Sequence, residues 1–387
     1  MSVAVEPVPK QARGRSVIRI CLIVENHWRA VMGGAPYQGR VIAESLAARP
    51  EFEVFYLARR CFDDADDPYT IVRIGSSAGI RRRAVFFDAP DLWSALKAID
   101  PDVIYQRMRQ SYTAVAALYA RRYAKRFVFH AASDYDVMPG RFRKHLSLNT
   151  PFDWAEGVLG EFGLRRAGAI VTQTQRQADL LRDKFALRAA AVIPNMHPEP
   201  GTEESDLRKP DSTVQVAWVA NFKLVKRPEH FVQLAEDLKD NKALRFVMAG
   251  RAGHERTYRG LHQKISSLAN LDYLGELSHD EVNVLLKQSH FLVNTSDVEG
   301  FSNTFIQAWM RDTAILSMKV DVDGAFARRG LGYLAGSYEE LRRLLVELSA
   351  DPTGLFPTLR RARDFALEHY STRKIDQLID VLTRGLR

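Results

Sequence analysis

Short apolar runs alternate with longer amphipathic stretches along almost the whole chain, and this alternation limits the fold more than any other feature. The first run, residues 17–24, is rich in Val, Ile and Leu, and the stretch at 35–49 carries apolar residues with helical spacing. Runs that are apolar throughout are typical of parallel strands buried on both faces of a sheet. The alternation therefore predicts an α/β fold with doubly wound parallel sheets.

The alternation forms two series, separated at 195–212 by prolines, a glycine and mixed charges without periodicity, which is typical of a linker. We predict a loose tail at 1–17, an N-terminal domain at 18–194, a C-terminal domain at 213–356 and an interrupted helical end at 357–387. Further strands are predicted at 54–57, 103–105, 127–130, 169–172, 191–194, 214–220, 244–249, 271–274, 291–294 and 314–316. Two Rossmann-like domains with parallel sheets would face a central cleft, and such sheets bind ligands outside the carboxyl ends of their strands.

The composition favours a folded protein of a reducing compartment. Of the 387 residues, 46% are hydrophobic and 26% are charged, as in ordinary globular domains. Cys21 and Cys61 are too few for a disulfide framework or a structural zinc site. The segment 1–17 lacks an apolar core of signal-peptide length, and no apolar stretch approaches the ~18 residues of a membrane span, so we expect a cytoplasmic protein.

Positive charge is concentrated in the first half of the chain. Up to residue 194 there are 29 Lys and Arg against 20 Asp and Glu, and after it 26 against 27. Basic clusters at 81–83, 121–126 and 141–144 suit phosphate, nucleic acid or an anionic membrane, and solvated arginines on helix faces give the same pattern. Because no nucleic-acid-binding motif accompanies the charge, we expect no nucleic-acid partner. A peripheral contact with the inner face of an anionic membrane stays open.

The loop at 25–34 ends in Gly33 and Gly34, just ahead of the first predicted helix. It lacks the G-x-G-x-x-G fingerprint, which disfavours a nicotinamide-dependent dehydrogenase. Two residues without Cβ let backbone N–H groups approach an anion at the positive end of a helix. An ordinary tight turn explains the same pair.

The segment 297–309 is the most informative part of the chain. A predicted strand leads into a Glu-Gly turn and then a helix, so residues 302–304 fall in the first helical turn, where unpaired amides and the helix dipole favour a phosphate. We expect Glu299 to point from the strand end into the cleft, and Gln307 to lie about two turns along the same helix face. A carboxylate accepts hydrogen bonds from sugar hydroxyls, and an amide can pair with ribose hydroxyls.

This segment is similar to the Glu-x7-Glu motif of the retaining GT-B glycosyltransferases of family 4, and the resemblance covers nearly the whole chain from Ile18 onwards. It implies that Glu299 contacts the donor sugar. Gln307 stands where the family has its second Glu, and the resemblance gives it the contact with the nucleotide ribose. The other donor-binding residues expected in this segment are Gly300, Phe301, Ser302, Asn303 and Thr304.

The segment 218–229 resembles the family's strand-loop-helix in which an Arg and a Lys hold the donor diphosphate. Lys226 matches the Lys, whereas Asn221 stands at the position of the Arg. We expect Lys223 to supply the missing charge, because two ammonium groups would offset the charge that develops on a leaving diphosphate. Read alone, lysines in such a pattern are more often solvated side chains.

In the first domain, the resemblance places His130 near the donor sugar and the acceptor hydroxyl, although a histidine at a strand end is often structural. It places Gly33 and Gly34 in a loop that approaches the donor phosphate. Residues 192–195 resemble the family's exit from the first domain, and the final helix resembles one that crosses back to brace that domain.

Two Asp-x-Asp triplets, at 134–136 and 321–323, are weak metal signals because short acidic triplets are common in loops. Lysines and a helix dipole can replace Mg²⁺ as the stabiliser of a leaving diphosphate. We therefore expect a metal-independent reaction without a cofactor besides the nucleotide sugar.

Together these observations predict a retaining glycosyltransferase of polysaccharide biosynthesis. It would move a hexose-like sugar from a nucleoside diphosphate sugar to a hydroxyl of a glycan or a lipid-linked saccharide. The catalytic residues expected are His130, Lys223, Lys226 and Glu299. A nucleotide-sugar epimerase on the same fold and a non-catalytic nucleotide-sugar-binding partner subunit are the alternatives.

Overall fold

The computed structural model describes residues 17–61, 66–76, 84–140, 150–204, 209–210, 212–253 and 255–386. The chain divides into an N-terminal unit, residues 1–196 with 372–387, and a C-terminal unit, residues 197–371. The first division falls within the range expected for the linker. Nearly all of the expected tail at 1–17, and the basic clusters at 81–83 and 141–144, lie outside the described residues.

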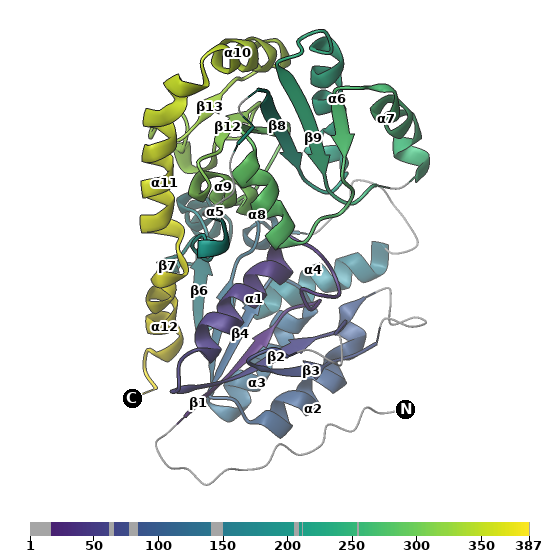
Figure 1. The fold of residues 1–387 in the computed structure, drawn as a ribbon. Helices are drawn as coiled ribbons and strands as arrows, with labels where there is room; N and C mark the ends of the chain where they lie inside the picture. Colours follow the sequence, from purple (N-terminus) through teal and green to yellow (C-terminus); the bar gives the residue numbers. More distant parts are fainter. Residues whose placement is uncertain are drawn as a thin grey trace. The chain divides into compact units, whose positions relative to one another are not determined.

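The N-terminal unit is built on a parallel sheet of seven strands in the order β3-β2-β1-β4-β5-β6-β7 (Figure 1). Its strands are β1 Ile18–Ile23, β2 Phe52–Ala58, β3 Thr70–Arg73, β4 Val103–Arg107, β5 Arg126–His130, β6 Ala169–Thr172 and β7 Ala191–Val192. Its helices are α1 Gly34–Ala47, α2 Ala89–Ile99, α3 Ser111–Tyr123, α4 Thr150–Leu164, α5 Gln175–Phe185 and α12 Ile375–Thr383.

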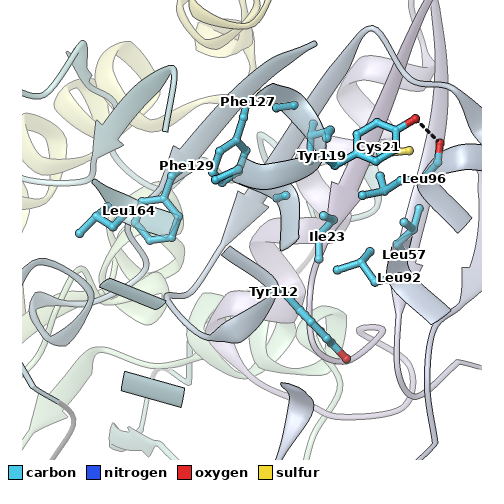
Figure 2. Close-up of a cluster of buried hydrophobic side chains, with 14 of the residues drawn as sticks. Cys21, Ile23, Leu57, Leu92, Leu96, Tyr112, Tyr119, Phe127, Phe129 and Leu164 are labelled. Atoms are coloured by element: carbon cyan, nitrogen blue, oxygen red, sulfur yellow. Dashed lines mark hydrogen bonds between the residues drawn. The ribbon is translucent and has the colours of Figure 1, made fainter. Parts of the chain in front are cut away.

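Both faces of this sheet are buried, because successive residues of β1 point into different cores. Cys21 and Ile23 belong to the cluster in Figure 2, in which the Tyr119 hydroxyl also donates a hydrogen bond to the Leu96 carbonyl oxygen at 2.9 Å. Ile20 and Leu22 belong to a second cluster that includes residues of α1 and α12. The end of the chain is therefore part of the core of the N-terminal unit.

The C-terminal unit holds a parallel sheet of six strands in the order β10-β9-β8-β11-β12-β13. Its strands are β8 Val214–Val219, β9 Leu244–Ala249, β10 Leu271–Tyr273, β11 Phe291–Asn294, β12 Ala314–Ser317 and β13 Tyr333–Leu334. Its helices are α6 Pro228–Asp237, α7 Glu255–Ser267, α8 His279–Gln288, α9 Asn303–Met310, α10 Tyr338–Ala350 and α11 Phe356–Tyr370. Two apolar clusters cover the two faces of this sheet.

The predicted fold class is confirmed for each unit, since both are α/β domains around a parallel sheet. The helical end predicted at 357–387 consists of α11 in the C-terminal unit and α12 in the N-terminal unit, and Ser371 is the last residue of the C-terminal unit. No helix in the described part of the chain combines the length and the apolar character that a membrane crossing requires.

Candidate active site

The candidate site lies at the carboxyl edge of the C-terminal sheet, where β8 and β11 are neighbours. The loops after these two strands are bonded to each other. The Asp297 N–H donates to the Val225 carbonyl oxygen at 2.9 Å, and the Thr295 hydroxyl donates to the Lys226 carbonyl oxygen at 2.8 Å. Trp218, buried in β8, donates its indole N–H to the Thr295 hydroxyl oxygen at 2.9 Å. These bonds therefore hold the two loops in fixed positions relative to each other.

Glu299 and Lys226 lie on these two bonded loops and contact each other. The Lys226 ammonium donates to Glu299 Oε1 in an ion pair, and the two side chains are 22% and 11% exposed. The Ser296 hydroxyl donates to the same oxygen at 2.8 Å, and the Asn294 amide approaches it at 3.4 Å. These contacts fix the carboxylate through Oε1, so Oε2 is the oxygen suited to accept a hydrogen bond from a ligand hydroxyl.

Lys223 adds positive charge to the site. It immediately precedes the short 3-10 turn Leu224–Lys226 and is exposed to solvent. Although the residue is exposed, partial desolvation by the surrounding loops, and then the charges of Lys226 and Arg251, lower the pKa of Lys223 below its ordinary value. Crowding of cations of this kind is typical of a site for a polyanion.

The side-chain oxygen of Asn221 is engaged within the C-terminal unit. Its Oδ1 accepts the backbone N–H of Arg251 at 2.9 Å, and so ties the end of β8 to the end of β9. Its expected direct contact with the donor stays a prediction. The structure gives Asn221 a positioning role within the C-terminal unit.

The start of α9 has the properties expected of an anion-binding helix end. Ser302 is the N-cap, but its hydroxyl pairs with the Thr304 hydroxyl at 2.8 Å and not with a backbone amide. The first turn of α9 contains no acidic residue. The dipole at this helix end is therefore not offset by an acid of the first turn. Gly300 precedes Phe301, whose ring packs edge-on against Tyr370 at 5.0 Å.

Gln307 lies inside the C-terminal unit. Its side chain belongs to α9, is 1% exposed, and donates through Nε2 to Asn283 Oδ1 of α8 at 2.7 Å. The structure thus gives Gln307 a packing role between two helices. The ribose contact implied by the resemblance stays a prediction.

His130 is enclosed in the N-terminal unit at 1% exposure. Its Nδ1 lies 2.8 Å from the Tyr105 hydroxyl, and its Nε2 lies 3.1 Å from the Ile193 carbonyl oxygen. Burial and the nearby Arg107 guanidinium lower the pKa of His130 well below its ordinary value of 6.5. A neutral imidazole that donates from Nε2 and accepts at Nδ1 has both nitrogens engaged. In the structure both ring nitrogens of His130 are thus engaged within the N-terminal unit, and its expected position beside the reacting hydroxyl stays a prediction.

Gly33 directly precedes α1, and Gly34 is its first residue. The turn at Gly33 does not depend on glycine. Gly33 is the N-cap, with an extended backbone at φ 176°. A Cβ there would meet only Pro36 Cδ, at an ordinary 3.7 Å. The local backbone therefore does not require glycine at this position.

The Asp-x-Asp triplets have local structural partners. Asp136 accepts the backbone N–H groups of Arg109, Ala132 and Ser133, and Asp134 pairs with Arg176 at 3.0 Å. Asp321 accepts the backbone N–H groups of Phe326 and Ala327. Among the described residues, no three His, Cys, Asp or Glu side chains are grouped as metal ligands.

The sequence reasoning missed four residues of this edge: Asn294, Thr295, Ser296 and Arg251. The first three form a polar run in which Asn294 ends β11 and Thr295 and Ser296 follow it, a position at which parallel sheets carry ligand-binding residues. Arg251 is the second residue after β9, so it also lies at the carboxyl end of a parallel strand.

The two halves of the chain match two related sequence families. Residues 32–197 match "Glycosyltransferase Family 4", and residues 201–363 match "Glycosyl transferases group 1". The fold and these matches make the chain a glycosyltransferase of the GT-B class. Its N-terminal domain is of the family 4 type, and its C-terminal domain belongs to group 1. No curated protein sequence matches the chain.

Solved structures of glycosyltransferases share the fold over nearly the full length. Sucrose-phosphate synthase from Thermosynechococcus elongatus is 17% identical, with a TM-score of 0.74 over 95% of this chain and 99% of that one. WaaG, a glycosyltransferase involved in lipopolysaccharide biosynthesis, is 13% identical, with a TM-score of 0.72 over 95% and 100%. HepE from Anabaena, solved in complex with UDP and glucose, is 15% identical, with a TM-score of 0.70 over 94% and 98%.

Proposed function

We propose that the protein is a retaining glycosyltransferase that uses a nucleoside diphosphate sugar and glycosylates a hydroxyl of a glycan or a lipid-linked saccharide. The proposal rests on the ion pair between Lys226 and Glu299, which lies at one edge of the C-terminal sheet, a few residues before the start of α9. A cation, a hydrogen-bond acceptor and a helix end are what a diphosphate joined to a sugar requires. Both family matches favour transfer over an epimerase or a non-catalytic partner.

In the proposed reaction, Lys223 and Lys226 bind the diphosphate together with the first amides of α9, and Glu299 accepts a hydrogen bond from a hydroxyl of the donor sugar. Because these groups lie on fixed loops, they stabilise the charge that grows on the diphosphate as the bond to the sugar breaks. The acceptor oxygen attacks the anomeric carbon from the face that the diphosphate leaves. The leaving phosphate oxygen takes the acceptor's proton, so that the configuration is retained and no covalent intermediate forms.

Donor binding is tested first, with UDP, GDP, ADP and their glucose conjugates in a thermal-shift titration. A ligand at 100 times its dissociation constant should raise the free energy of unfolding by about 2.7 kcal/mol. If none of these ligands changes the melting temperature, the proposed donor class is wrong.

Glu299→Ala tests the sugar contact. Because the carboxylate is proposed to accept a hydrogen bond from a hydroxyl of the donor sugar, we expect its removal to lower kcat by about 10²-fold or more while the protein stays folded. Release of the nucleoside diphosphate is the readout, and Glu347→Gln, an exposed acid of α10, is the matched control. Unchanged turnover in Glu299→Ala would remove Glu299 from the site.

We further propose that the reaction needs no metal and no cofactor besides the nucleotide sugar. The three positive contributions at the site, from Lys223, Lys226 and the α9 dipole, support this. Loss of turnover in a chelator, restored by added Mg²⁺ or Mn²⁺, would overturn it.

A further inference from the structure

Arg251 lies directly against Asn221, the position at which the resemblance to family 4 implies an arginine. Its backbone N–H donates to Asn221 Oδ1 at 2.9 Å, and its carbonyl oxygen accepts the N–H of Phe222 at 3.0 Å. The two residues come from neighbouring strands, since β8 and β9 pair in parallel up to Val219 and Ala249. Arg251 therefore reaches the carboxyl edge of the sheet beside Asn221, although 30 residues separate them.

The approach of the two strand ends depends on Gly250. Its φ of 143° is a conformation that other residues rarely adopt, and a Cβ would lie 1.8 Å from the Ala220 carbonyl oxygen. The Gly250 N–H donates to the Gly275 carbonyl oxygen at 2.7 Å, and its own carbonyl oxygen accepts the Tyr273 hydroxyl at 2.8 Å. The backbone that carries Arg251 is thus bonded on both sides and closely packed.

The Arg251 side chain is available to a ligand. It is 52% exposed, and its nearest carboxylate within the described residues is Glu276, at 3.9 Å. At that distance and exposure an ion pair is weak. The charge of Arg251 also contributes to the lowered pKa of Lys223, which agrees with a short separation between the two cations.

We propose that Arg251 is a third cation of the diphosphate site and supplies the charge that the resemblance to family 4 would place at Asn221. The inference rests on the proposed function, since a nucleoside diphosphate is the ligand that Arg251 would hold. Its guanidinium presents paired N–H donors that match two phosphate oxygens, which an ammonium group does not. Asn221 then serves the same site indirectly, by fixing the backbone of Arg251.

The test compares the wild type with Arg251→Ala by calorimetric titration, using whichever of UDP, GDP and ADP binds most tightly and the matching monophosphate. We expect Arg251→Ala to weaken diphosphate binding by about tenfold or more, the range of a hydrogen bond to a charged group, and monophosphate binding by about threefold at most. The double variant Asn221→Arg with Arg251→Ala should recover most of the lost affinity, because it returns the charge to the neighbouring position. Arg360→Ala, which removes an 88% exposed arginine of α11, is the charge-matched control and should bind as the wild type does.

Two results would overturn the inference: diphosphate binding in Arg251→Ala within twofold of the wild type, or an equal loss for the diphosphate and the monophosphate, which would mark a structural effect. Failure of all three diphosphates to bind the wild type is a different result. It would refute the proposed function, and the inference would fall with it.

Discussion

Lys226 and Glu299 form an ion pair with each other, although the proposed reaction gives them different partners. Both side chains are largely shielded from water, so their attraction is stronger than that of an exposed pair. A donor diphosphate would compete for the Lys226 ammonium, whereas Ser296 and Asn294 would still hold Glu299. The carboxylate can therefore keep its orientation when its cationic partner turns towards the ligand.

His130 gives a prediction about pH. Burial and Arg107 keep the pKa of His130 well below 6.5, so the folded protein holds the imidazole neutral where the unfolded chain takes up a proton. Below pH 6.5 the unfolded state binds more protons, so this contribution to the free energy of unfolding is present above pH 6.5 and is lost as the pH falls. Urea unfolding of the wild type should show the loss between pH 7 and 5.

His130→Gln should show a smaller fall than the wild type over the same pH range. At pH 7 it should already be less stable, by about 1–3 kcal/mol, because a buried hydrogen-bond partner of Tyr105 or Ile193 is disturbed. An equal pH dependence in the two proteins would mean that the imidazole is not held neutral by the fold.

At the scale of elements, α8 and α9 are joined by a polar contact inside an apolar layer. Gln307→Met should remove the hydrogen bond, leave Asn283 without its buried donor, and lower the free energy of unfolding by about 1–3 kcal/mol. Adding Asn283→Leu should restore part of that loss, because two apolar side chains then face each other. Urea unfolding of the four proteins in a double-mutant cycle measures the coupling, and simple additivity would exclude the contact.

The ends of β8 and β9 give a second prediction at this scale. Gly250→Ala should destabilise the C-terminal unit by more than 1 kcal/mol and weaken diphosphate binding, because the new Cβ collides with the Ala220 carbonyl oxygen and displaces Arg251. Gly260→Ala is the control: it lies in α7 with no atom within 4 Å of its Cβ, so a gain of about 0.5–1 kcal/mol is expected there. Thermal unfolding and nucleotide titration compare the two, and equal stability would refute the collision.

Most of the elements could be predicted from the sequence, because the strands of a parallel sheet are apolar throughout and their helices are amphipathic. The predicted strand at 244–249 coincides with β9, and the break near Tyr370 separates α11 from α12. The short edge strands β3 and β13 were missed, since four and two residues carry too little periodicity. The bonds of His130, Gln307 and Arg251 depend on which strands and helices become neighbours, and local sequence patterns do not contain that information.

At the scale of the whole molecule, the excess charge of the first half is only partly available to partners. In the cluster at 121–126, Lys125 pairs with Asp100 at 2.8 Å, and Arg126 donates to the Val381 carbonyl oxygen of α12 at 2.8 Å. Arg121 and Arg122 stay exposed at the end of α3. Much of this cluster thus serves the fold of the N-terminal unit.

The two exposed arginines nevertheless predict a weak attraction to anionic membranes, as the excess positive charge of the first half of the chain also suggests. Each basic residue near such a surface contributes about 1 kcal/mol, and the contribution falls with ionic strength. In flotation at low salt, the protein should accompany phosphatidylserine vesicles more than phosphatidylcholine vesicles. The double variant Arg121→Glu with Arg122→Glu should reduce this difference, and Arg360→Glu in the C-terminal unit should leave it nearly unchanged. Equal flotation with both lipids would show that the positive charge of the N-terminal unit serves solubility and folding and not the membrane.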